Sequence, residues 1–169
     1  MRYITILLLF FSSCSSSACD CASIRDLEGA QKVLYENADI VFIGKAIEKD
    51  SDYSYRFSIV EMFKGDSQLS TVDGTSDKSC VVSPDKVGEL WLVYGHFTDD
   101  GRIIMDECGI SRSFDHPYLY LSGETIPGPP NSKSEDQALD IIDSNNQWAI
   151  RKQKHLEILR QEILDLRNK

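Results

Sequence analysis

The chain has 169 residues, among them 27 acidic and 18 basic side chains, which give a formal net charge of −9 at pH 7. This acidity argues against nucleic acid as a partner, because binding to phosphates depends on clustered lysine and arginine. A chain of this length is expected to form one domain once any leader is removed.

The first predicted element is a leader. One arginine and a short apolar run, ITILLLFF, are followed by small residues. The run is too short to cross the hydrocarbon core of a membrane, which takes roughly 20 residues. This layout predicts a signal peptide over residues 1–18 and therefore an exported protein.

Two cleavage sites compete in this leader. The small residues 16–18 favour ordinary cleavage before Cys19, which predicts a secreted or periplasmic protein. The sequence FSSC, which ends at Cys14, instead resembles a bacterial lipobox and predicts that Cys14 is lipidated. We favour the lipid anchor, on the outer surface of a membrane, because the small residues 15–18 suit a tether.

The other cysteines predict disulfides. Either cleavage removes Cys14 from the free thiols and leaves Cys19, Cys21, Cys80 and Cys108. An even set of cysteines in an exported chain predicts two disulfides. A bond between Cys19 and Cys21 would close a strained small ring. Two long-range pairings therefore stay open, namely Cys19–Cys80 with Cys21–Cys108, or the crossed alternative.

A helix and then a series of strands are predicted up to residue 110. The helix has Ser23 as its N-cap and ends at Asn37. Strand-like runs follow at residues 38–48, 55–63, 69–72, 89–95 and 102–108. Alternation in the second run places Tyr55, Phe57 and Phe63 on one face, and TDDG between the last two runs predicts a hairpin. About five strands and one helix predict a sandwich or a small barrel.

The C-terminal part has a different composition. Residues 122–133 are rich in Pro, Gly and Ser and predict a linker, and residues 134–169 predict a helical tail that can break at residues 144–146. An apolar stripe over 149–166 is formed by Ala149, Leu156, Leu159, Ile163 and Leu166. Its two clean heptads are fewer than a coiled coil needs. We therefore expect the helix to pack on its own domain, and a homodimer through the 149–166 stripe is the alternative.

No motif predicts catalysis. His96, His116 and His155 have no metal-ligand spacing with one another or with a cysteine. The chain contains no nucleophile elbow, phosphate-binding loop, zinc-protease motif or dinucleotide fingerprint. We expect a binding protein and not an enzyme, with no cofactor and no metal of its own.

Several motifs together resemble a known family. They are C-D-C after the leader, ADIVFIGKAIE, IVEMFKGD, a cysteine before GELWLVYG, and ECGISRSF, and they span roughly residues 19–115. In this order they resemble the netrin-like domain of tissue inhibitors of metalloproteinases, in particular its bacterial members. The resemblance implies a mainly β fold, an OB-fold with a five-stranded Greek-key barrel and an N-terminal helix, over residues 19–121. It also implies the pairing Cys19–Cys80 with Cys21–Cys108.

The resemblance also implies a function. In the animal inhibitors the free α-amine and carbonyl of the N-terminal cysteine chelate the zinc of a metalloprotease, and the position that matches here is Cys19. The implied protease-binding ridge consists of Cys19, Asp20, Cys21, Ala22, Asp77, Lys78, Ser79 and Cys80. If Cys14 is the mature terminus, the nitrogen of Cys19 is an amide and does not chelate. The favoured function is therefore a lipid-anchored module that binds a protein partner, with a secreted inhibitor of a zinc metalloprotease as the alternative.

Overall fold

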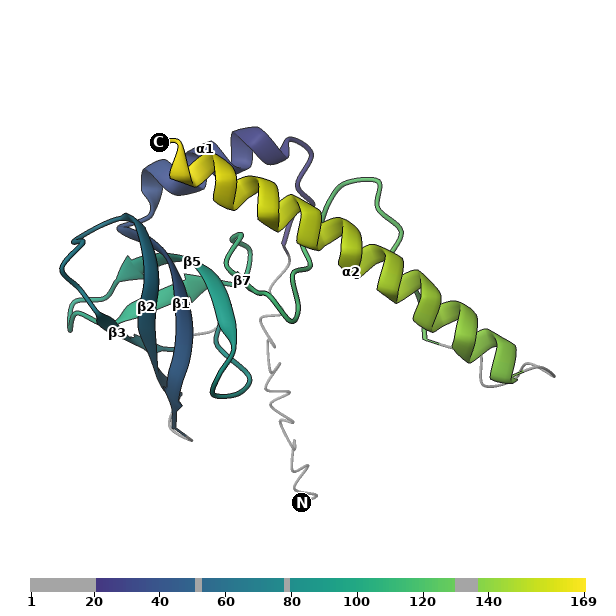
Figure 1. The fold of residues 1–169 in the computed structure, drawn as a ribbon, viewed down its shortest axis with the longest axis horizontal. Coiled ribbons are helices and arrows are strands. Elements are labelled where there is room, and N and C mark those ends of the chain that lie inside the picture. Colours follow the sequence, from purple (N-terminus) through teal and green to yellow (C-terminus); the bar gives the residue numbers. More distant parts are fainter. Residues whose placement is uncertain (1–20, 51–52, 78–79, 130–136) are drawn as a thin grey trace, which may run out of the picture.

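Five strands close into a barrel in this computed structural model, which describes residues 21–50, 53–77, 80–129 and 137–169 (Figure 1). The barrel strands are β1 (Ile40–Lys49), β2 (Ser54–Lys64), β3 (Thr71–Thr75), β5 (Leu90–Phe97) and β6 (Ile103–Asp106). Antiparallel pairs join β3 to β2, β2 to β1, β1 to β5 and β5 to β6, and a parallel contact between β3 and β6 closes the barrel. This is the connectivity of an OB-fold, so the predicted fold class is confirmed.

Two further strands are short. β4 (Val81–Val82) pairs with β6, and β7 (Arg112–Ser113) pairs with β5. Both lie at the ends of the sheet order, outside the closed ring. They hold the segment before β5 and the segment after β6 against the barrel wall. Both segments take part in the site described below.

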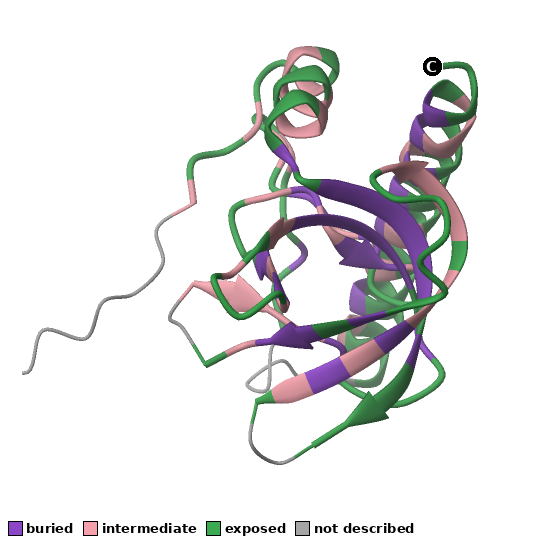
Figure 2. Cartoon of the chain, turned by 90° about the vertical axis from the view of Figure 1, so that its left-hand side faces the viewer, coloured by how far each residue is buried: buried purple, intermediate pink, exposed green. Residues whose placement is uncertain are grey.

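The barrel encloses an apolar core. Alternate residues of the strands point inward, as expected for a twofold side-chain period, and Figure 2 shows the strands curving around this interior. The Phe57 ring meets those of Phe42 and Tyr55 edge to face, with ring centroids 5.7 and 5.5 Å apart. The buried core residues are Ile40, Phe42, Ala46, Tyr55, Phe57, Val72, Trp91, Val93, Ile103 and Met105.

A second apolar cluster lies outside the barrel, beneath the two helices. It explains why β1 is apolar on both faces: Ile40 and Phe42 point into the barrel, and Val41 and Ile43 point to the helices. The buried members of this outer cluster are Ala38, Val41, Ile43, Leu92, Tyr94, Ile110, Leu119, Leu159 and Leu166.

Helix α1 (Leu27–Asn37) starts later than the sequence predicts. Its N-cap is Asp26, whose carboxylate accepts a hydrogen bond from the backbone N–H of Gly29 at 3.0 Å. The preceding residues are held in an extended segment, because the N–H of Ile24 donates to the carbonyl of Tyr120 at 2.6 Å. The predicted N-cap at Ser23 is therefore wrong.

Alternation along β2 is interrupted. The register between β1 and β2 shifts at two points between Val41 and Gly44, which is the signature of β-bulges. As a result Met62 packs on the barrel core and Phe63 packs on the outer cluster. The prediction that Phe63 shares a face with Tyr55 is wrong, because a bulge reverses the direction of the side chains that follow it.

Helix α2 (Gln137–Arg167) is one continuous helix, so the predicted break at residues 144–146 does not occur. Ser144 at this point donates from its hydroxyl to the carbonyl of Gly128 at 3.1 Å. The C-terminal half of α2 packs on the barrel through Leu159 and Leu166, as favoured from the sequence (Figure 1). These two residues of the 149–166 stripe are covered by the chain's own barrel, and a homodimer through that stripe stays a prediction.

A helix that crosses a bilayer must be both long and apolar. No helix among the described residues has both properties.

Candidate functional site

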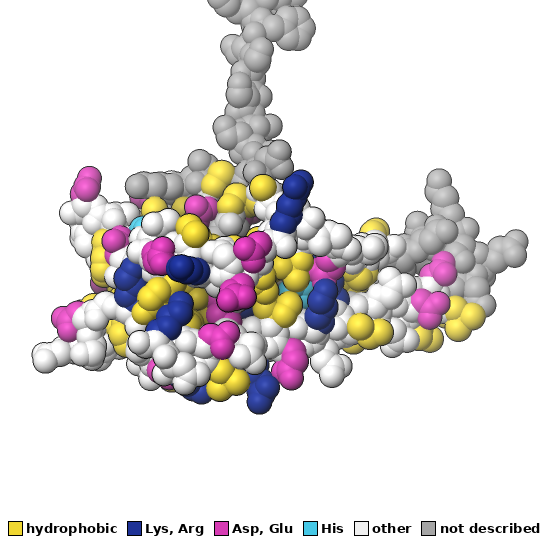
Figure 3. Space-filling model, turned by 90° about the horizontal axis from the view of Figure 1, so that it is seen from above, with side chains coloured by type: hydrophobic (Ala, Val, Ile, Leu, Met, Phe, Trp, Pro, Cys, Tyr) yellow, Lys and Arg dark blue, Asp and Glu magenta, His cyan; other side chains and the backbone are white. Residues whose placement is uncertain are grey.

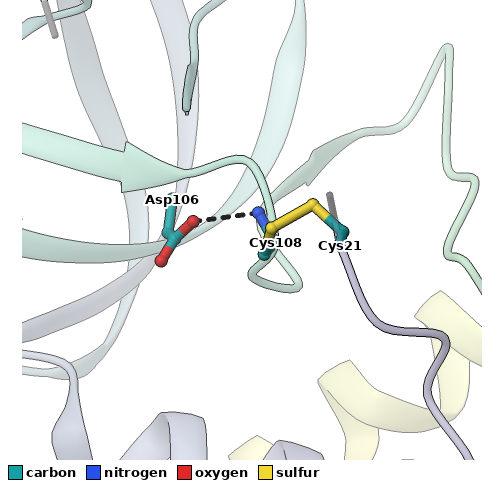
Figure 4. Close-up of a disulfide and its surroundings, with 3 residues drawn as sticks. All are labelled: Cys21, Asp106 and Cys108. Atoms are coloured by element: carbon teal, nitrogen blue, oxygen red, sulfur yellow. Dashed lines mark hydrogen bonds between the residues drawn. A yellow bond between two sulfur atoms is a disulfide. The ribbon is translucent and has the colours of Figure 1, made fainter. Parts of the chain in front are cut away.

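The N-terminal segment is fixed to the barrel by a disulfide. Cys21 is bonded to Cys108, 87 residues further along, with the two Cα atoms 5.1 Å apart (Figure 4). This bond confirms one half of the pairing that the resemblance implies and excludes the crossed alternative. The other half involves Cys19, which lies outside the described residues, and Cys80 is not a free thiol.

The turn that carries Cys108 is built by the residue that ends β6. The Asp106 carboxylate accepts a hydrogen bond from the N–H of Cys108 at 2.9 Å, and its carbonyl accepts one from the N–H of Gly109 at 3.1 Å (Figure 4). Between them, the N–H of Glu107 donates to the carbonyl of Cys80 at 2.9 Å. The Cys80 and Cys108 segments therefore lie side by side, although 28 positions separate them in the sequence.

The structure brings only part of the implied ridge together. Cys21, Ala22 and Cys80 lie at the turn that carries Cys108. Asp77 lies just beyond β3, where its N–H approaches the hydroxyl of Thr75 at 3.4 Å. Four ridge residues fall outside the described part of the chain, namely Cys19, Asp20, Lys78 and Ser79.

A cavity of about 420 Å³ lies beside this N-terminal edge. One wall is the N-terminal segment with the Cys108 turn, and the other comes from residues 82–85 and 111–120. Aromatic and charged side chains contribute to the lining, namely Asp85, Trp91, Glu107, Arg112, His116, Tyr118 and Tyr120. Its lining is mixed, because these charged and aromatic groups stand beside apolar residues such as Ile24 and Leu119.

Arg112 lies at the buried end of the cavity and is 3% exposed. Its guanidinium donates to the carbonyl of Ile110 at 2.7 Å and to the Glu162 carboxylate of α2 at 2.6 Å. The same carboxylate accepts a 2.6 Å hydrogen bond from the Tyr94 hydroxyl. Burial, with the neighbouring Glu162, raises the pKa of Tyr94, so its hydroxyl stays protonated and donates.

The Nε atom of Arg112 has no hydrogen-bond partner among the described residues. A buried donor without a partner costs about 1–3 kcal/mol. The charge of the guanidinium is balanced by Glu162.

A second buried carboxylate supports the part of the wall formed by residues 82–85 and Trp91. Glu89 is 3% exposed and accepts hydrogen bonds from the indole N–H of Trp91 at 3.1 Å and from the backbone N–H of Asp85 at 3.0 Å. These bonds fix the Trp91 ring and the segment before β5 relative to each other. The wall is therefore preformed.

A further polar cluster joins residues 118–124 to α2. The fully buried His155 accepts a hydrogen bond at Nδ1 from the N–H of Leu119 (3.2 Å), so its proton is on Nε2, 2.9 Å from the Glu124 carboxylate. Burial lowers the pKa of His155, although Glu124 acts in the opposite direction. Burial also acts to raise the pKa of Glu124, but hydrogen bonds from His155 and Lys154 outweigh it and the pKa is lowered. The start of the predicted linker is thus clamped to the helix.

Metal-ligating side chains are dispersed. Within the described ranges, no three His, Cys, Asp or Glu side chains are placed to hold a metal ion together. His96 lies 3.7 Å from Asp39, His155 is in the cluster above, and His116 lines the cavity.

Sequence reasoning did not find the cavity. Arg112 appears in the motif ECGISRSF, but nothing local marks it as buried or as paired with a residue 50 positions away. Comparisons of the chain with models of protein families and with curated protein sequences find no match.

Proposed function

We propose that the protein is a non-catalytic binding module of the netrin-like type, anchored by a lipid on Cys14 and facing the outside of the cell membrane. Its protein partner docks on the N-terminal edge at Cys21 and Ala22 and on the cavity beside it. The observation that carries the proposal is the disulfide between Cys21 and Cys108, which holds this edge rigidly at the mouth of the cavity. A preorganised edge loses little entropy on binding.

The chemistry of the cavity indicates the kind of partner. Asp85 and Glu107 are exposed at its rim, and a balanced Arg112–Glu162 pair lies at its buried end. This arrangement supports a protein segment that supplies a basic side chain to the acidic rim. An acidic segment would meet like charges.

The alternative is a secreted inhibitor that chelates the zinc of a metalloprotease through a free Cys19 amine. It is favoured by the confirmed Cys21–Cys108 bond, which is the pairing that the resemblance implies. Asp20 is unfavourable for it, because burying an unpaired carboxylate in a protease pocket is costly.

Mass spectrometry of the mature exported protein separates the two functions. A lipid-modified Cys14 at the N-terminus supports the module and rules out the chelator. An unmodified Cys19 terminus rules out the anchor; inhibition of a zinc endopeptidase should then be lost when one alanine is added before Cys19. Undiminished inhibition by the extended protein would refute chelation.

A photocrosslinker tests the docking surface in cells that make the protein. Placed at the exposed Ala22, it should give a discrete adduct with one protein. The matched control is Val60 on β2, which is 61% exposed and does not line the cavity. Identical adducts from both positions, or none from Ala22, would contradict docking at this edge.

A further inference from the structure

Helix α2 carries a row of exposed residues on the side away from its buried residues. The row, here called the α2 seam, consists of Leu139, Ile142, Asn146, Ala149, Gln153 and Leu156. Its large apolar members are exposed to solvent: Leu139 is 56%, Ile142 52% and Leu156 38% exposed. Large apolar side chains exposed along one face of a helix indicate a contact surface.

The seam and the barrel lie on different sides of α2. The residues that face the barrel and its loops are Ser144, Arg151, His155 and Leu159, all buried. At 100° per residue the seam is centred roughly 150° around the helix from this buried row. In addition, the N-terminal half of α2 extends beyond the barrel (Figure 1). The space-filling view shows apolar side chains along this projecting part (Figure 3). A second helix can therefore reach the seam.

We propose that the α2 seam binds the α2 seam of a second copy of this chain, as a short parallel pair of helices. The spacing of the six residues alternates between three and four, which is the heptad pattern of such a contact. It places Leu139, Asn146 and Gln153 at the first core position, and Ile142, Ala149 and Leu156 at the second.

Asn146 favours the parallel arrangement. An asparagine at a first core position pairs with its counterpart in a parallel dimer, which favours this register. In an antiparallel arrangement with full overlap of the seam, Asn146 would instead face Ala149, and its amide would lose this partner.

The flanking charges favour the same arrangement. In a parallel dimer, Lys152 of one copy lies across the contact from Glu157 of the other copy, five residues further along the chain. The two copies therefore form opposite-charge pairs. Full antiparallel overlap would place Lys152 opposite Asn145 and Asp143 opposite Ile150, with no opposite-charge pair. Asp140 and Asp143 beside the apolar residues disfavour a membrane as the occupant.

The dimer is expected to be concentration-dependent. The seam covers residues 139–156, roughly 27 Å of helix at 1.5 Å per residue, and two of its core residues are polar. In a parallel dimer both copies present their N-terminal edges at the same height along the common axis. Anchoring in one membrane would therefore raise the effective concentration of the two copies.

Disulfide trapping tests the geometry in the full-length exported protein. Asn146→Cys places two thiols within bonding distance across the proposed parallel core, and mild oxidation should give a covalent dimer on non-reducing gels. Gln147→Cys is the matched control, since this neighbour is also exposed but points away from the core. We expect at least fivefold more dimer from Asn146→Cys, and equal yields would overturn the proposal.

Analytical ultracentrifugation of the Cys14→Ser protein provides the second measurement. Ile142→Asp should raise the dissociation constant at least tenfold without changing the circular dichroism spectrum. Ile126→Asp, at an equally exposed isoleucine outside the helix (51%), should leave it unchanged. Wild-type protein that stays monomeric at all concentrations would overturn the dimer. If Ile142→Asp abolished binding to phosphatidylcholine vesicles and left sedimentation unchanged, the dimer proposal would be overturned. The seam would then be assigned to contact with a membrane surface.

Discussion

At the scale of single residues, the buried charges decide how the parts of this protein are joined. Arg112 and Glu162 are each 2% exposed at the side chain and link β7 to α2 across 50 positions of sequence. His155 and Glu124 link α2 to the loop that follows β7. Each group is held by at least one hydrogen bond, so the loss of one partner leaves a buried charge or donor uncompensated.

Glu162→Gln should therefore destabilise the protein strongly. It leaves the Arg112 charge buried without a counter-charge, which costs about 3–5 kcal/mol. Urea denaturation followed by tryptophan fluorescence measures the change. Glu36→Gln, at an exposed residue of α1, is the control and should cost less than about 0.5 kcal/mol. Similar losses from both variants would contradict the role given to the buried pair.

His155 should make the free energy of unfolding depend on pH below about 6.5, the ordinary pKa of a histidine. Its pKa is lower in the folded protein than in the unfolded chain, so the unfolded state binds more protons as the pH falls below about 6.5. Stability is thus fully present above this pH. It decreases below it by up to about 1.4 kcal/mol per pH unit, until the folded-state pKa is reached.

Chemical denaturation at pH 7.5, 6.5 and 5.5 checks this dependence. His155→Gln should be less stable than the wild type at pH 7.5 and should lose the decrease between pH 6.5 and 5.5. The lowered pKa of Glu124 acts in a separate window, because the stability it contributes is lost only as the pH falls below about 4.5. An unchanged slope in the histidine variant would assign the effect to another group.

At the scale of elements, the strands follow their sequence patterns and α1 ends at Asn37 as predicted, but the start of α1 differs from the prediction. Five strands lie where apolar alternation and turn residues predicted them, and Gly101, with φ of +80°, is in the predicted hairpin turn between β5 and β6. The start of α1 was misplaced by a few residues, because both Ser23 and Asp26 are good N-caps by type. Only the pairing of Ile24 with the chain at Tyr120 decides between them.

The N-cap of α1 can be tested directly. Asp26→Ala removes the acceptor for the Gly29 N–H and should cost about 1 kcal/mol of unfolding free energy. Ser23→Ala should change stability by less than about 0.5 kcal/mol, because this exposed residue precedes the helix. Thermal unfolding of the two variants side by side measures the difference, and the reverse order would restore the cap at Ser23.

At the scale of the whole molecule, the barrel and α2 form one structural unit. The outer cluster takes buried residues from β1, β5 and α2, so removing the helix exposes them. The C-terminal segment was predicted as a tail behind a linker, with packing on the barrel as the favoured arrangement. The packing is confirmed, and Glu124 and Gly128 of the linker themselves contact α2.

A chain that stops after residue 129 should therefore fail to fold stably. It would expose Val41, Ile43 and Leu92 and leave Arg112 buried without Glu162. We expect binding of a hydrophobic dye and loss of a cooperative unfolding transition. A truncated protein with the near-ultraviolet circular dichroism and the cooperativity of the full chain would show that the barrel is independent of the helix.

The sequence by itself determined the local structure: where strands run, where the chain turns, that the C-terminal segment is helical, and that distant cysteines pair. These features depend on side-chain period, turn chemistry and cysteine count, which neighbouring residues encode. Only the tertiary structure showed that bulges in β2 turn Phe63 outward and that Arg112 meets Glu162 beside a cavity. It also decided between the two cysteine pairings that the residues alone left open, in favour of the one that the resemblance implies. Such contacts join residues far apart in the chain, and their geometry exists only after the barrel has closed and α2 has packed upon it.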